Sequence, residues 1–103
     1  MPEGDIVKLN VSGVTEGFEV SKKVLCSIPE SSLSNMFSGK YPLKVIDERV
    51  FLDRDSKIFR LVLSYLRNNR APLNIDDNLT ANLFELELKH WRLLQPKEND
   101  TIR

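Results

Sequence analysis

The stretch that decides the fold reads Val50-Phe51-Leu52-Asp53-Arg54-Asp55-Ser56-Lys57-Ile58-Phe59-Arg60-Leu61-Val62-Leu63-Ser64-Tyr65-Leu66-Arg67. Its first three residues are apolar and suit a short strand, whereas the apolar residues from Ile58 to Leu66 recur at helical spacing. Asp55 suits the N-cap position of that helix, because its carboxylate can accept hydrogen bonds from free backbone N–H groups of the first turn. The stretch therefore predicts a strand that passes through three charged residues, Asp53, Arg54 and Asp55, into a central helix.

The beginning of the chain has the pattern of a β-hairpin. Val7, Leu9 and Val11 alternate with polar residues within residues 6–11, as in a strand with one buried face. Gly13 and Gly17 can adopt positive φ without steric strain and predict a turn, after which residues 18–20 suit a second strand.

Two short helices are expected between residues 21 and 39. Ser21 is a candidate N-cap for the first helix, which Pro29 prevents from continuing. Ser31 or Ser32 begins the second helix, and Gly39 lies where a left-handed residue would end it. Residues 45–46 suit either a strand or a loop, and residues 50–52 are the better strand candidate.

A longer helix is expected after residue 72. Residues 76–78 (Asp-Asp-Asn) offer N-caps, and Glu85 and Lys89 are spaced to form an i,i+4 ion pair. Residues 84–89 also alternate as in a strand, but leucine, glutamate and lysine favour a helix. The side chains of this helix expected to face inward are Leu79, Leu83, Phe84 and Leu86. Together the elements predict an α+β fold with a small three-stranded sheet, an N-terminal β-hairpin and about four to five flanking helices.

The chain of 103 residues is long enough for one hydrophobic core and too short for two domains. We expect an N-terminal tail over residues 1–5, a folded domain over residues 6–94 and a polar tail over residues 95–103. No apolar run approaches the roughly 20 residues that cross a bilayer, so no direct membrane insertion by this segment is expected.

The balance of acidic and basic residues limits the classes of partner that the chain is expected to bind. Lysine plus arginine and aspartate plus glutamate number 15 each, which gives no net charge. A chain without a basic excess lacks the field that draws proteins to phosphate backbones, so nucleic acid is not an expected partner. Cys26 is the single cysteine and cannot form an intramolecular disulfide, which suits a reducing, cytoplasmic location.

Histidine and cysteine, two residues that often carry enzyme chemistry, occur once each. His90 is the single histidine and lies between a lysine and a tryptophan, which is typical of a structural or surface histidine. Cys26 has no second cysteine or histidine at ligand spacing, which argues against zinc. The glycines form no phosphate-binding loop, and no G-x-S-x-G motif is present. We therefore expect no catalytic residue, metal or cofactor.

The charged junction between strand and helix has two interpretations. Asp53, Arg54 and Asp55 can cap the helix and pair within the chain, or they can contact another chain. The planar guanidinium of Arg54 suits bidentate pairing with a carboxylate across an interface, and the flanking acids supply reciprocal partners in a symmetric assembly. An isolated surface pair contributes little energy, so such contacts serve specificity more than affinity.

Five segments, in order, resemble the BTB/POZ domain of the potassium-channel tetramerisation type, which is found in voltage-gated potassium channels and in KCTD proteins. The resemblance covers nearly the whole chain. The histidine and paired cysteines that bind zinc in some channel branches are missing, and the turn from Gly13 to Phe18 is longer than is usual. The segments are Leu9-Asn10-Val11-Ser12-Gly13, Phe18-Glu19-Val20-Ser21 with Leu25, Pro29-Glu30-Ser31-Ser32-Leu33 with Met36-Phe37-Ser38-Gly39, Phe51-Leu52-Asp53-Arg54-Asp55 with Phe59, Val62-Leu63 and Tyr65-Leu66-Arg67, and Leu83-Phe84-Glu85-Leu86-Glu87 before His90-Trp91.

The resemblance implies a non-catalytic homo-oligomerisation and protein-interaction module. Identical subunits would form a ring, a tetramer or a pentamer, through a largely polar interface, and the ring would set the stoichiometry of attached domains. The interface residues that the resemblance implies are Asn10, Asp53, Arg54, Asp55 and Arg67. On this hypothesis Arg54→Glu is expected to weaken assembly without touching the core.

Two other functions stay open at this point. The resemblance to KCTD proteins also allows a substrate adaptor for a cullin-3 ubiquitin ligase. A small enzyme would require activity that depends on His90 or Cys26.

Overall fold

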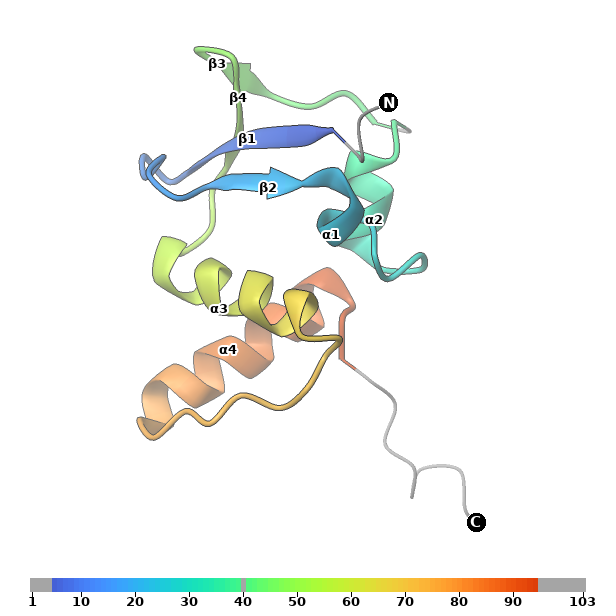
Figure 1. Cartoon of the computed structure of the whole chain (residues 1–103). Helices are drawn as coiled ribbons and strands as arrows, with labels where there is room; N and C mark the ends of the chain where they lie inside the picture. The colour runs from blue at the N-terminus through green and yellow to red at the C-terminus, as the bar shows by residue number, and fades with distance from the viewer. Residues whose placement is uncertain (1–4, 40, 95–103) are drawn as a thin grey trace.

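A mixed four-stranded sheet forms one layer of the protein, with the strand order β2-β1-β4-β3 (Figure 1). The computed structural model describes residues 5–39 and 41–94. Strand β1 (Ile6–Val11) pairs antiparallel with β2 (Glu19–Ser21) and parallel with β4 (Arg49–Leu52). Because β1 and β4 run in parallel, their C-terminal ends meet at one edge of the sheet, and the charged junction begins there.

The expected N-terminal hairpin is confirmed, but the expectation of three strands is wrong. Residues Val45–Ile46 form a fourth strand, β3, which pairs antiparallel with β4. The turn between them is made by Asp47 and Glu48, which both adopt positive φ, at 52° and 68°. Two-residue hairpins need this left-handed geometry and usually obtain it from Asn-Gly or Gly, so two acidic residues are no clear turn signal.

The described residues form four helices, and each begins at a polar N-cap. They are α1 (Lys22–Leu25), α2 (Ser32–Phe37), α3 (Ser56–Arg67) and α4 (Asn78–Trp91). Their N-caps are Ser21, Ser31, Asp55 and Asp77, and each side chain accepts a hydrogen bond from a backbone N–H two or three residues on. The capping residues expected from the sequence are confirmed, and Gly39, with φ 94°, follows the end of α2.

Helix α3 is the centre of the fold and lies between the sheet and α4 (Figure 1). Its residue Phe59 is fully buried, and its ring centroid lies 6.3 Å from that of Phe18 and 5.9 Å from that of Trp91. One aromatic row therefore connects the hairpin, α3 and the end of α4, and ring contacts of this kind add to the energy of area burial.

The expected inward face of α4 is partly wrong. Phe84 is buried, but Leu79, Leu83 and Leu86 are 65%, 40% and 59% exposed. The residues of α4 that face the core follow a different row of the helix and are Phe84, Glu87, Leu88 and Trp91. Glu87 takes a core position because its carboxylate is paired with Arg54 and Trp91, as described below, and this turns the three leucines toward solvent.

The predicted tail over residues 95–103 lies outside the described residues, as do residues 1–4 of the N-terminal tail. Within the described ranges, no helix combines the length and the apolar character that a membrane span requires.

Candidate functional site

Four of the five expected interface residues lie together where β1 and β4 end. Asn10 on β1 is in register with Phe51 on β4, two residues before Asp53. The side-chain oxygen of Asn10 accepts a hydrogen bond from the Gly13 backbone N–H at 2.7 Å and closes the turn after β1. The Ser12 hydroxyl in that turn lies 2.7 Å from the Arg54 carbonyl oxygen and donates to it, so the turn holds the junction in place.

The guanidinium of Arg54 forms a bidentate ion pair with Glu87 of α4. Its Nε donates to Glu87 Oε2 at 2.9 Å, and its Nη2 donates to Oε1 at 2.7 Å. The indole Nε1 of Trp91 donates to the same carboxylate at 2.8 Å. We call this group of three residues the clamp. The Glu87 side chain is 6% exposed and the Arg54 side chain 33%, so the ion pair is buried at its Glu87 end and reaches the surface through Arg54.

The clamp keeps its charges at ordinary pH. Burial acts to raise the pKa of Glu87, but the hydrogen bonds from Arg54 and Trp91 outweigh it and hold that pKa below its ordinary value. The hydrogen bond to Glu87 raises the pKa of Arg54 above its ordinary value. Bidentate pairing and an indole donor satisfy most of the carboxylate's hydrogen-bonding capacity, which makes a buried charge tolerable here.

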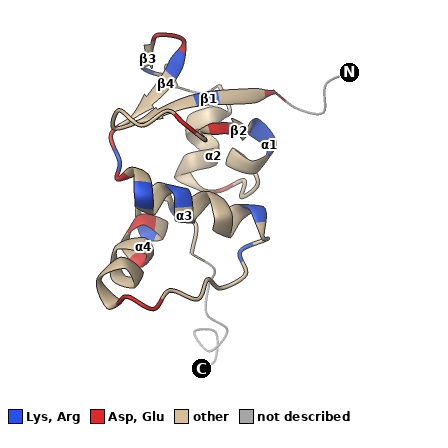
Figure 2. Cartoon of the chain, turned by 60° about the vertical axis from the view of Figure 1, so that its left-hand side comes forward, with Lys and Arg blue, Asp and Glu red and all other residues tan. Residues whose placement is uncertain are grey.

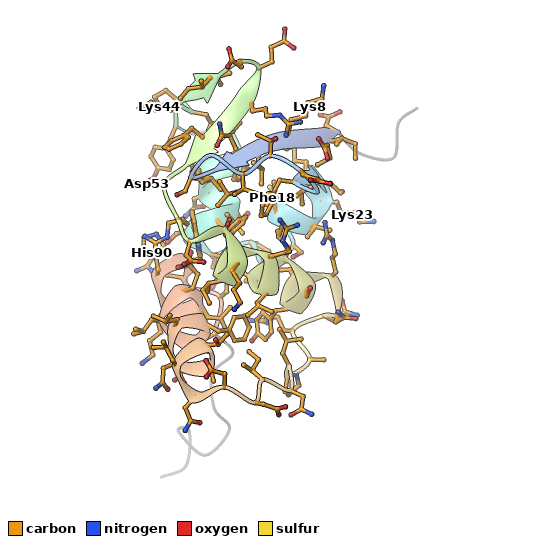
Figure 3. All side chains as sticks on the ribbon, turned by 90° about the vertical axis from the view of Figure 1, so that its left-hand side faces the viewer. Lys8, Phe18, Lys23, Lys44, Asp53 and His90 are labelled. Atoms are coloured by element: carbon orange, nitrogen blue, oxygen red, sulfur yellow. The ribbon has the colours of Figure 1, made fainter. Side chains whose placement is uncertain are left out.

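Asp53 and Asp55 flank the clamp and are exposed. Asp55 accepts from the Ile58 backbone N–H at 3.0 Å and caps α3, and Asp53 lies 3.3 Å from the Ser12 hydroxyl. Beside them is a hollow of about 320 Å³, lined by Asp53, Arg54, Asp55, Ile58, Leu83, Leu86 and Glu87. We call these lining residues the acidic edge. Figure 3 shows Asp53 on the same side of the molecule as His90 of α4.

Arg67 does not join the other four residues. It is exposed in the last turn of α3, about 18 Å along the helix axis from Asp55 at 1.5 Å per residue. The structure thus brings Asn10, Asp53, Arg54 and Asp55 together and places Arg67 at the opposite end of the same helix.

Glu87, Leu83 and Leu86 were not identified as site residues from the sequence. A signal for Glu87 was present, because it shares a helical row with Phe84, Leu88 and Trp91, and an acid on an apolar row needs a buried cationic partner. The hollow could not be found in this way, since it depends on how α4 is rotated against the junction.

Other chemistry-bearing groups lie apart from the acidic edge. His90 is exposed, with its ring edge-on to Trp91 at 4.8 Å between centroids. A larger, mainly apolar cavity of about 480 Å³ lies beside Tyr65, Leu73 and Phe84, and none of the five expected interface residues lines it. Across residues 5–39 and 41–94, no group of three or more His, Cys, Asp or Glu side chains is placed to hold a metal ion.

Removal of Arg54 is expected to destabilise the domain itself. The expectation that this residue does not touch the core is wrong, because its loss leaves the Glu87 carboxylate buried without its cation. Arg54→Ala should lower the free energy of unfolding by about 2–3 kcal/mol, less than for a fully buried pair because the Arg54 side chain is one-third exposed. Urea unfolding measures this. The control is Lys89→Ala, which removes an exposed pair at 3.9 Å from Glu85 and should cost under about 0.5 kcal/mol; equal losses would contradict the clamp.

The lowered pKa of Glu87 predicts a loss of stability in acid. The unfolded chain binds this proton more readily, so the stabilisation is present above the ordinary pKa of 4.5 and is lost as the pH falls through the lower folded value. Glu87→Gln should be less stable than the wild type at neutral pH and should lose less of its unfolding free energy between about pH 5 and about pH 3. Asp77, whose pKa is lowered by its hydrogen bonds with Thr80, contributes equally to both proteins. If the unfolding free energies of the wild type and Glu87→Gln changed with pH in parallel, Glu87 would not be charged in the folded protein.

Comparison with known proteins gives the family. The BTB/POZ domain profile matches residues 7–100. KCTD21, a BTB/POZ domain-containing protein of mouse and human, is 41% identical over 73 residues, which cover 70% of this chain and 27% of that protein. Bovine KCTD18 is 38% identical over 63 residues, or 60% of this chain and 14% of that protein. The potassium channel regulatory protein of mouse is 36% identical over 73 residues, 70% of this chain and 27% of its own length.

These relatives are much longer, and the chain spans about a quarter of the length of KCTD21. The profile match extends over both the hairpin and α4, so it includes every element that builds the clamp and the acidic edge. The sheet with its covering helices agrees with this assignment. The chain belongs to the BTB/POZ domain family, in its potassium-channel tetramerisation type, and is a protein-interaction and oligomerisation module.

Proposed function

We propose that this domain assembles with copies of itself into a closed ring of four or five subunits and thereby sets the stoichiometry of whatever is attached to it. The observation that carries the proposal is the acidic edge. Asp53 and Asp55 are exposed, yet the junction that bears them is fixed by the α3 cap, the Ser12 turn and the clamp. Exposed charges on a rigid support suit recognition, because little side-chain and backbone freedom is lost on binding.

The proposed interface residues have different roles. Asp53 and Asp55 present carboxylates to a neighbour, and Asn10 shapes the turn next to them. The guanidinium of Arg54 is already paired with Glu87. Arg54 therefore holds the acidic edge in position and can contact a partner only through its exposed side. Arg67, at the other end of α3, belongs to a different face of the subunit, as a ring of identical subunits requires.

Light scattering coupled to size exclusion measures the assembly directly. At tens of micromolar, the wild-type domain should elute with a mass of four or five subunits, because a ring closes at a fixed number and does not grow further. A strict monomer at that concentration would contradict the proposal.

A second candidate function is that of a cullin-3 substrate adaptor. It is favoured by the similarity to KCTD21 and KCTD18, in which the matched segment is 27% and 14% of a longer protein. A domain joined to further sequence can bind one partner itself and present another through the attached part.

The adaptor function predicts that the immobilised domain retains purified cullin-3, with a dissociation constant in the micromolar range or tighter. The control is the same domain carrying Arg54→Ala, whose junction is loosened and which should bind less. No retention of cullin-3 by the wild-type domain, in an oligomeric state confirmed by light scattering, would exclude this candidate alone.

A further inference from the structure

The hollow of the acidic edge combines an apolar floor with an acidic rim. Ile58, Leu83 and Leu86 supply the apolar part, and the rim carries the carboxylates of Asp53 and Asp55. The other two charged lining residues, Arg54 and Glu87, form an ion pair and neutralise each other. The uncompensated charge of the hollow is therefore negative. Its apolar floor suits the aliphatic stem of a lysine or arginine, while its rim suits the cationic head.

Three exposed basic side chains lie on the opposite side of the same subunit. Lys22 and Lys23 are exposed on α1, and Arg67 is exposed at the end of α3. Figure 2 shows this basic colour on α1 and at the end of α3, away from the acidic colour of the β4–α3 junction and of α4. In Figure 3, Lys23 and Asp53 lie on opposite sides of the fold. We call Lys22, Lys23 and Arg67 the basic edge.

We propose that the acidic edge binds the basic edge of a second copy of this chain, with a lysine of α1 entering the hollow. The inference rests on the proposed self-assembly and names the two surfaces that meet. The charge arrangement favours this occupant, because one subunit carries both complementary surfaces. A twofold contact of the acidic edge with itself would place carboxylates against carboxylates, whereas a head-to-tail contact pairs opposite charges and generates a ring when the rotation closes.

The contact also accounts for the two exposed leucines next to the rim. Leu83 and Leu86 are 40% and 59% exposed in the single subunit, and both line the hollow. A neighbour seated on the hollow covers them, which adds apolar burial to an otherwise polar contact. Leu79, on the same helix and 65% exposed, does not line the hollow and provides a matched control.

Charge reversal and mixing test the pairing. Asp53→Lys and Lys23→Glu should each weaken assembly by about tenfold or more, because each puts like charges together at every contact. Mixing the two variants in equal amounts should restore assembly, since the reversed acidic edge of one now meets the reversed basic edge of the other. A four-membered ring can alternate the variants completely, whereas a five-membered ring retains one mismatched contact. Sedimentation velocity measures both the affinity between subunits and the mass of the assembly.

Further variants distinguish a failure of the proposed contact from a failure of self-assembly or of folding. Leu83→Ser and Leu86→Ser should weaken assembly, whereas Leu79→Ser and Lys8→Glu, outside both edges, should leave it unchanged. Circular dichroism checks that each variant folds. If the wild type assembles and the charge reversals assemble equally well, or if mixing restores nothing, the pairing of edges is overturned and the self-assembly stands. If the wild type is a monomer, the self-assembly itself fails.

Discussion

The ion pair between Arg54 and Glu87 is the constraint on which the rest of the interaction surface depends. It joins the strand-to-helix junction to a helix that begins more than twenty residues later, and Trp91 adds a third hydrogen-bonding partner. A buried pair is not in itself a strong source of net stability, since an apolar replacement of equal volume is often as stable. Its effect is on geometry, because only one rotation of α4 brings Glu87 to the guanidinium.

That rotation determines what the surface presents. With Glu87 turned inward, Phe84, Leu88 and Trp91 follow it into the core, and the leucine row of the same helix is left in solvent. Two of those leucines then lie beside the carboxylates of the junction and form the hollow. The polar core contact and the apolar surface patch are thus two consequences of one helix orientation. A domain that works by association can retain such a patch because its neighbour covers it.

Much of this fold could be predicted from local sequence signals. The capping residues, the glycine turn after β1 and the long amphipathic helix depend on short spacings, and all of them are present in the structure. The hairpin through Asp47 and Glu48 was not predicted, because two charged residues there adopt a conformation that usually selects glycine or asparagine. The pairing of β3 with β4 holds Asp47 and Glu48 in this conformation, and local residue propensities do not include the energy of that pairing.

The site was predictable only in part. Asp55 as a cap follows from its position alone, whereas the partner of Arg54 lies 33 residues away and no spacing rule connects them. The sequence pattern misplaces the inward face of α4, because leucine is more hydrophobic than glutamate and hydrophobicity does not register a carboxylate that is fully paired. Long-range polar pairs of this kind determine how a helix is rotated about its axis. A single sequence contains little information about which residues form such pairs.

A double-mutant cycle on unfolding tests the clamp most directly. Arg54→Met, Glu87→Leu and the double variant are unfolded in urea beside the wild type, and the loss of the Trp91 hydrogen bond cancels because it occurs on both sides of the cycle. The account predicts a coupling energy of about 2 kcal/mol or more between the two side chains, as for a hydrogen-bonded charge pair with one buried partner. Additive effects, with a coupling energy near zero, would contradict it.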